Sequence, residues 1–272
     1  MEYETIRGEQ IPKIGLGTWR MEGATCRNAV STALELGYRH VDTAQAYGNE
    51  RQVGQAIATA DVAREDVFLT TKVWPMHRSY RDIVDSVHGS LARLGTDYVD
   101  LLLIHWPNPI ASTREVMRAL SDLRSEGLTR HIGVSNFDVD QLAAAQNAAG
   151  APVLTDQVQF HPFHPQSDLL DYCREHGVLL TAYSPLAHGG VVDDHVLTEL
   201  GAKYEKTPAQ VALRWVVQHD GVVTIPKAAS EEHLEENLAV FDFELTETEM
   251  ALVERPSRVR TGVSRLRGRF ER

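Results

Sequence analysis

Eight short apolar runs alternate with amphipathic stretches along this chain of 272 residues, and the alternation predicts an α/β fold, a (β/α)8 or TIM barrel. Most of the runs are apolar at successive positions, as expected of parallel strands that helices cover. Eight equal units in 272 residues have 34 residues each, enough for one strand, one helix and two loops. An open, doubly wound sheet shares this alternation and stays an alternative, because a linear pattern does not reveal whether the sheet closes.

The expected strands are rich in β-branched and apolar residues and are bounded by turn residues. They lie at residues 14–18, 40–44, 67–73, 98–105, 131–136, 154–160, 178–185 and 221–226. In front of them, residues 3–14 predict a short N-terminal β-hairpin.

The helices between the strands keep apolar residues at helical spacing, and the clearest lie at 79–94, 112–126 and 138–148. Each begins with a polar capping candidate, namely Ser79, Ser112 or Asp138. No linker or internal repeat interrupts the pattern, so we expect a single barrel domain over residues 1–272.

The charge of the chain narrows the classes of function. Its 27 Lys and Arg against 38 Asp and Glu give a net charge of −11, which argues against nucleic-acid and anionic-membrane binding. No run approaches the roughly 20 apolar residues of a membrane helix, and the first residues contain no apolar export segment. We therefore expect a cytoplasmic protein, and a monomer, since no exposed apolar helix requires a partner.

Three charged or titratable residues end neighbouring strands, where a barrel of this class places its active site. Asp42 follows the second strand, Lys72 ends the third and His105 ends the fourth. A lysine inside the apolar segment LTTKVW is costly to bury unless a carboxylate pairs with it, and Asp42 is the natural partner. These residues alone are also compatible with an ion pair that only stabilises the barrel.

Tyr47, five residues beyond Asp42, favours chemistry over a purely structural pair. A phenol has a reference pKa of about 10, and a neighbouring ammonium group lowers the pKa by stabilising the phenolate. We expect Lys72 to lower the pKa of Tyr47 so that the phenol becomes a general acid. His105 would donate a hydrogen bond to the same substrate oxygen, which suits protonation of a developing alkoxide.

Seven segments of the chain match a known family in order and spacing: GYRHVDTAQAYGNE, LTTKVW, LLLIHWP, HIGVSNF, QVQFHP, AYSPLA and IPKAASEEHLEEN. Together they resemble the signature blocks of the aldo-keto reductase superfamily, and most closely its short prokaryotic 2,5-diketo-D-gluconate and methylglyoxal reductases. The resemblance implies a barrel that reduces aldehydes or ketones, such as small dicarbonyls and keto-sugars, by hydride transfer from NADPH or sometimes NADH. It also implies that the catalytic residues are Asp42, Tyr47, Lys72 and His105.

The resemblance further implies a cofactor-binding set. Ser135, Asn136 and Gln157 would hydrogen-bond the nicotinamide carboxamide, and Tyr183 would stack on the ring. Asn136 and Gln157 are also compatible with simple capping of strand ends. The diphosphate would lie against the glycine-containing loop 184–190, and the adenosine 2′-phosphate near Lys227. The remaining members of the set are Gly17, Thr18, Asp42, Ser184, Leu186, His233, Glu236 and Asn237.

Two departures from the family pattern bear on the choice of cofactor. Ala228 replaces a frequent serine, and His233 stands where an arginine is common. A neutral imidazole offers one donor, whereas a guanidinium offers a fixed fork and a permanent charge. We therefore expect NADPH to be preferred through Lys227, by a narrower margin over NADH than usual.

Three tryptophans that follow strands, Trp19, Trp74 and Trp106, are candidates for an apolar substrate pocket, with core packing as the alternative. Phe160 and His161 could form another wall. No carboxylate or cysteine accompanies His161 and His164 at ligand spacing, so we expect no metal site.

The last 18 residues, 255–272, contain seven arginines on an otherwise acidic chain. Such a run is usually solvated, although the resemblance implies a segment over the barrel mouth in which Arg265 or Arg267 could attract an acidic sugar derivative. Two other functions stay open. One is a non-catalytic sensor or regulatory subunit that binds nicotinamide nucleotides. The other is an isomerase or lyase in which Lys72 forms a Schiff base.

Overall fold

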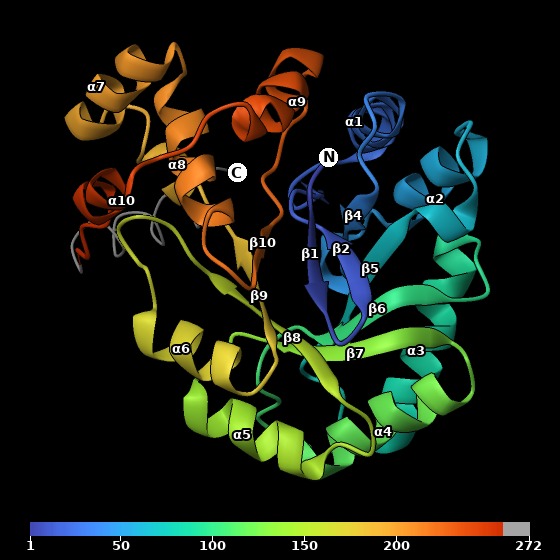
Figure 1. Cartoon of the computed structure of the whole chain (residues 1–272). Helices are drawn as coiled ribbons and strands as arrows, with labels where there is room; N and C mark the ends of the chain where they lie inside the picture. The colour runs from blue at the N-terminus through green and yellow to red at the C-terminus, as the bar shows by residue number, and fades with distance from the viewer. Residues whose placement is uncertain (258–272) are drawn as a thin grey trace.

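Figure 1 shows the computed structural model of the protein, in which the described residues are 1–257. Its centre is a parallel sheet of eight strands that helices surround. In sheet order the strands are β3 (Leu16–Gly17), β4 (His40–Asp42), β5 (Phe68–Val73), β6 (Val99–Ile104), β7 (Thr129–Ser135), β8 (Val153–Gln159), β9 (Leu179–Tyr183) and β10 (Val222–Thr224). Each lies within two residues of a predicted strand, which confirms the βα repeat.

The first and last strands meet, and this contact closes the sheet. Ile14 and Thr224 form a parallel bridge, and the Gly15 amide donates to the Thr224 carbonyl at 2.8 Å. One step along, the Gly17 amide donates to the Pro226 carbonyl at 3.1 Å. A Cβ at Gly17 would lie 2.5 Å from the Ile225 carbonyl oxygen, so only glycine fits this seam. The fold is a (β/α)8 barrel, and the open-sheet alternative is excluded.

The helices follow the strands in turn. They are α1 (Gly23–Glu35), α2 (Glu50–Thr59), α3 (Tyr80–Leu94), α4 (Thr113–Ser125), α5 (Val139–Ala148), α6 (Ser167–Glu175), α7 (His195–Tyr204), α8 (Pro208–Val217), α9 (Glu231–Leu238) and α10 (Glu247–Val253). Short 3₁₀ turns lie at η1 (Gln45–Tyr47), η2 (Arg64–Asp66), η3 (Ala187–Gly189) and η4 (Ala239–Phe241).

The three predicted caps are present at the helix starts. Ser79, Ser112 and Asp138 each accept a hydrogen bond from the backbone amide three residues on. In α5 the cap is reciprocal, since the side chain of Gln141 bonds back to the Asp138 amide. Each cap satisfies a backbone donor that the helix leaves unpaired, which stabilises it by about 1 kcal/mol.

The predicted hairpin closes the N-terminal end of the barrel. β1 (Tyr3–Ile6) pairs antiparallel with β2 (Glu9–Pro12), as Figure 1 shows in blue. Ile11 of β2 is 1 % exposed. It packs with buried strand residues in one apolar cluster, which contains Leu101, Leu103, Leu154, Leu179 and Val223. This plug leaves the opposite, C-terminal ends of the strands as the open end of the barrel.

The residues that follow α10 are hydrogen-bonded to the loop that follows β8. The Arg255 amide donates to the Pro162 carbonyl at 2.9 Å, and the Ser257 amide donates to the Phe163 carbonyl at 3.0 Å. Arg255 also forms an ion pair with Asp194. Most of the predicted arginine-rich segment, including Arg265 and Arg267, lies outside the described residues. Within residues 1–257, no helix has the length and apolar character to span a membrane.

Candidate active site

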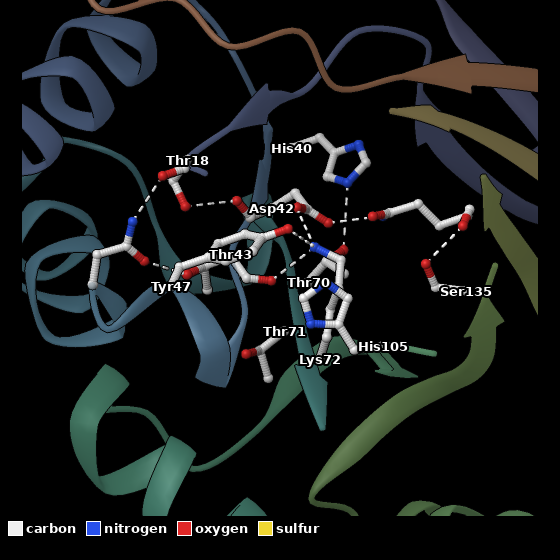
Figure 2. A network of polar contacts seen from close by, with 12 residues as sticks. Thr18, His40, Asp42, Thr43, Tyr47, Thr70, Thr71, Lys72, His105 and Ser135 are labelled. Atoms are coloured by element: carbon white, nitrogen blue, oxygen red, sulfur yellow. Dashed lines mark hydrogen bonds and ion pairs between the residues drawn. The ribbon is translucent and has the colours of Figure 1, made fainter. Parts of the chain in front are cut away.

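A cavity of about 1010 Å³ opens at the C-terminal ends of the strands. Its base contains Asp42 at the end of β4, Tyr47 in η1 and His105 directly after β6. Lys72 of β5 lies beneath them and is fully buried. The structure therefore brings together the four residues that the sequence analysis predicts as catalytic (Figure 2).

Strand register explains why Asp42 and Lys72 meet. Asp42 pairs across the sheet with Thr70, and Lys72 lies two residues further along β5. Because side chains alternate along a strand, Thr70 and Lys72 point to the same face, the barrel interior. The Lys72 Nζ atom lies 2.5 Å from Asp42 Oδ1, and both side chains are at most 1 % exposed. The predicted ion pair is present.

Lys72 donates to three oxygen atoms at once. Besides Asp42, its Nζ atom lies 3.0 Å from the Thr43 carbonyl and 3.1 Å from Tyr47 Oη. An ammonium group has three N–H donors, so this environment matches the charged form of Lys72. Burial lowers the pKa of Lys72, and the Asp42 charge opposes that shift. Burial likewise raises the pKa of Asp42, and Lys72 opposes it.

The second carboxylate oxygen of Asp42 is bonded across the barrel. Gln157 of β8 donates to Asp42 Oδ2 at 2.9 Å from its Nε2 atom. Both oxygens of the buried carboxylate therefore have donors, as a charge removed from water requires. The bond also links the ion pair to the predicted carboxamide site.

The expectation that Lys72 lowers the pKa of Tyr47 is wrong for this structure. Burial raises the pKa of Tyr47 well above 10, and the Asp42 charge adds to the rise. The expectation counted the ammonium but omitted the desolvation of the phenol and the carboxylate that offsets the ammonium charge. The raised pKa keeps the phenol protonated near neutral pH, as a proton donor must be.

His105 is neutral in this site. Burial and the Lys72 charge lower its pKa to about 3. Its ring contacts Tyr47 edge to face at a centroid distance of 5.6 Å. Its buried Nδ1 atom has no hydrogen-bond partner among the described residues. A neutral imidazole beside the phenol can donate one hydrogen bond without adding a charge.

Asn49 holds the Tyr47 loop, and the sequence analysis missed it. Its side-chain amide is buried and donates to the carbonyls of Thr18 at 2.8 Å and Met21 at 3.0 Å. Its Oδ1 atom accepts from the Thr43 hydroxyl at 2.7 Å. Asn49 thus fastens the loop after β4 to the loop after β3. The available signal in the sequence was the position of Asn49 directly after Tyr47 and Gly48.

The four residues predicted for the carboxamide and the ring lie together at the ends of β7, β8 and β9 and line the cavity. Ser135 donates to the Gln157 carbonyl at 2.7 Å. Asn136 accepts from the Tyr183 hydroxyl at 2.8 Å and has a left-handed φ of 63°. Donors and acceptors beside an aromatic ring suit a flat amide-bearing ring, so these residues fit a nicotinamide.

Of the other residues predicted to bind the cofactor, some line the cavity and some do not. Those that line the cavity are Gly17, Asp42, Ser184, Leu186 and Lys227. Thr18 does not line it, because its buried hydroxyl donates to the Asp42 carbonyl at 2.9 Å. The remaining three, His233, Glu236 and Asn237, lie on α9 outside the cavity lining.

Of the residues predicted to line a substrate pocket, some line the cavity and others are buried away from it. Trp19, Trp74 and Trp106 line the cavity and are 38, 44 and 49 % exposed, so core packing does not explain them. Phe160 is fully buried and stacks on Trp215 at 5.2 Å between ring centroids, and so does not form a wall. His161 is fully buried as well, and its Nδ1 atom accepts from the Phe163 amide. Within residues 1–257, no group of three or more His, Cys, Asp or Glu side chains could hold a metal ion.

The open end of this (β/α)8 barrel holds a buried Lys–Asp pair, a phenol and a neutral imidazole. These groups are typical of barrel enzymes that transfer a proton to or from a small bound molecule. Comparison with known proteins gives the family. A sequence model of the Aldo/keto reductase family matches residues 13–257. The chain belongs to the aldo/keto reductase family.

Individual relatives agree with this assignment. A glyoxal reductase of Bacillus subtilis is 43 % identical over 244 residues, which are 89 % of this chain and 88 % of that protein. The crystal structure of a putative 2,5-diketo-D-gluconic acid reductase B superposes with a TM-score of 0.91 at 47 % identity, covering 93 % of this chain and 90 % of the other. An aldo-keto reductase complexed with NADPH superposes with a TM-score of 0.87 at 33 % identity, covering 93 % of this chain and 86 % of the other.

Proposed function

We propose that this chain reduces aldehydes and ketones to alcohols with NADPH, and that Tyr47 donates the proton. The observation that carries the proposal is the 3.1 Å contact between Tyr47 Oη and an ammonium that Asp42 holds in place. When bound, the reduced nicotinamide supplies a hydride to the carbonyl carbon. The names of the relatives, which include a glyoxal and a diketogluconate reductase, support small dicarbonyls and keto-sugars as substrates.

The chain's own residues account for the proton. The carbonyl oxygen would bind within reach of both the Tyr47 hydroxyl and the His105 imidazole, whose rings lie edge to face at the base of the cavity. As negative charge develops on that oxygen, the Tyr47 proton moves to it and the alcohol forms. The phenolate left on Tyr47 is stabilised by Lys72, whose Nζ atom already donates to Oη. Asp42 acts by keeping Lys72 charged.

For the cofactor, we propose that Ser135, Asn136 and Gln157 hold the carboxamide and that Tyr183 supports the ring. Ser184, Leu186 and Gly17 would line the path of the diphosphate, with Lys227 at the 2′-phosphate. The NADPH-bound structural neighbour supports this choice of cofactor.

Two other functions lack support. A non-catalytic sensor has no need for a buried ammonium beside a phenol, and the named relatives are reductases. A Schiff-base enzyme needs a neutral lysine amine that can reach a carbonyl, whereas Lys72 is fully buried and donates to three oxygens.

Tyr47→Phe tests the proposal. Loss of the proton donor should lower kcat for methylglyoxal by about 10²- to 10⁴-fold, measured by NADPH absorbance. The dissociation constant for NADPH, measured by fluorescence titration, should change little, because the ring of residue 47 remains. Turnover equal to that of the parent would overturn the assignment of Tyr47.

His233→Arg tests the choice of cofactor. A guanidinium on α9 should raise the ratio of kcat/KM with NADPH to kcat/KM with NADH, because it adds a permanent charge for the 2′-phosphate. A parent that works equally well or better with NADH would contradict the NADPH preference.

A further inference from the structure

Two amide side chains connect three neighbouring loops at the open end of the barrel. The loop after β4 carries Gln45 and Tyr47, the loop after β5 carries Trp74, and the loop after β6 carries Asn108. We propose that Gln45 and Asn108 form a brace that positions Trp74 and thereby favours carbonyl substrates with an aryl group. The inference rests on the proposed reductase activity and adds two specificity-determining residues to it.

The side chain of Gln45 bonds to two other segments. Its Oε1 atom accepts from the Trp74 backbone amide at 2.9 Å and lies 3.3 Å from His77 Nε2. Its Nε2 atom lies 3.0 Å from Ser90 Oγ and 3.1 Å from Ser86 Oγ on α3. The backbone N–H of Trp74 can only donate, so it fixes which end of the amide is the oxygen. Gln45 therefore connects η1 to the start of the loop after β5.

Asn108 holds the same loop from its other side. Its Nδ2 atom donates to the His77 carbonyl at 2.9 Å. Its Oδ1 atom accepts from the backbone amides of Ile110 and Ala111, both at 2.8 Å. The segment 74–77 is thus fastened at its first residue by Gln45 and at its last by Asn108. Two fixed ends restrict the segment that carries Trp74.

The braced loops carry four exposed apolar side chains, two of which line the cavity. Trp74, Met76, Trp106 and Ile110, here called the apolar rim, are 44, 48, 49 and 50 % exposed. Trp74 and Trp106 also line the cavity. When an apolar ligand covers large apolar side chains at the edge of a cavity, the removal of their surface from water favours binding. An aryl group attached to the reacting carbonyl has the chemistry to do so, whereas methylglyoxal is too small to reach beyond the base.

The brace acts on Trp74 rather than on the proton donor. Tyr47 has its own supports, which are the Lys72 ammonium at 3.1 Å and the buried Asn49 side chain on the same loop. Removing the Gln45 amide leaves these supports in place and frees the Trp74 end of the next loop. The expected effect is therefore on binding of the aryl group and not on proton transfer.

The test compares benzaldehyde with methylglyoxal in Gln45→Ala, Asn108→Ala and the control Gln55→Ala, which removes an exposed amide from α2. Each brace variant should raise KM for benzaldehyde about five- to tenfold, the effect of losing one or two hydrogen bonds. The kcat for methylglyoxal and the KM for NADPH should stay within about twofold of the parent. Asn108 lies in a loop rather than an element, so its variant keeps the test valid should Gln45→Ala fail to fold.

A double-mutant cycle separates positioning from general destabilisation. In a Trp74→Ala background, Gln45→Ala and Asn108→Ala should have little further effect on KM for benzaldehyde, because the side chain they position is gone. Equal losses with both aldehydes, or the same fold-change with and without Trp74, would overturn the brace. A parent that reduces neither aldehyde would instead overturn the proposed function.

Discussion

The two ends of the barrel interior contain different kinds of side chain. At the N-terminal end, Ile11 of the hairpin fills the interior among leucine and valine side chains. At the C-terminal end, the interior holds a Lys–Asp pair, a protonated phenol and an imidazole with an unpartnered nitrogen. The apolar end stabilises the fold through buried apolar area. The polar end lowers the free energy of unfolding, because polar groups are removed from water there, and it contains the groups that the proposed reaction needs.

Backbone strain follows the same division. Within residues 1–257, eight residues other than glycine have a left-handed φ. Six of them follow barrel strands at the open end, namely Arg20, Asn136, Gln166, Ser184, Ala187 and His188. Such conformations cost about 1 kcal/mol or more each and persist where the surrounding structure enforces them. The N-terminal end of the barrel therefore supplies stability, whereas the open end carries the strained and buried polar groups of the site.

Lys72→Met should give the largest effect, because it should lower both stability and activity. The variant leaves the Asp42 carboxylate buried without its partner, which should lower the free energy of unfolding by about 3–5 kcal/mol. It should also remove turnover. Arg81→Met is the control, because Arg81 pairs with Asp85 on an exposed face of α3, where ion pairs contribute little. Denaturant melts and NADPH assays measure both effects, and a fully active Lys72→Met would show that the Lys72 ammonium is not needed for proton donation by Tyr47.

Ile11→Ala should separate stability from activity. Removing a buried side chain from the plug should cost about 2–4 kcal/mol of stability. The kcat and KM of the folded enzyme should not change, because the plug lies at the opposite end from the cavity. Leu252→Ala, at a side chain that is 50 % exposed, is the matched control. A large change in kcat would show that the two ends are coupled.

Asp156→Asn should give a smaller effect that depends on pH. The carboxyl group of Asp156 is fully buried and has no hydrogen bond of normal geometry among the described residues. Burial raises its pKa well above 3.8, the Phe137 backbone opposes the rise, and Asp138 adds to it.

The sign of the pH dependence follows from that shift. Between the unfolded and the folded pKa, the folded protein keeps a proton that the unfolded chain releases, so this group's contribution to stability falls as the pH rises above about 4. An asparagine carries no such proton. The Tm of the variant relative to the parent should therefore be higher at pH 8 than at pH 4, and the opposite trend would show that Asp156 is ionised in the folded protein.

Much of this could be predicted from the sequence, for identifiable reasons. Strand and helix positions follow from local apolar patterns and caps such as Ser112 and Asp138. The pairing of Asp42 with Lys72 follows from the cost of burying a lone charge.

What failed depended on the direction of a side chain or on summed electrostatics. Phe160 lies directly after β8, yet it stacks on Trp215 in the core, and the Thr18 hydroxyl points to the backbone. The pKa of Tyr47 required the burial of the phenol as well as its charged neighbours. Gln45 and Asn49 were missed because their partners are backbone and hydroxyl groups distant in the sequence.

The protonation state of the Tyr47 phenol bears most directly on its role as proton donor. An ultraviolet difference titration of the parent against Tyr47→Phe isolates this one ionisation from those of the other tyrosines. We expect no phenolate signal from Tyr47 up to about pH 10, where an ordinary tyrosine is half ionised. A phenolate signal that appears near pH 7 would show that Tyr47 is not the protonated, buried donor described here.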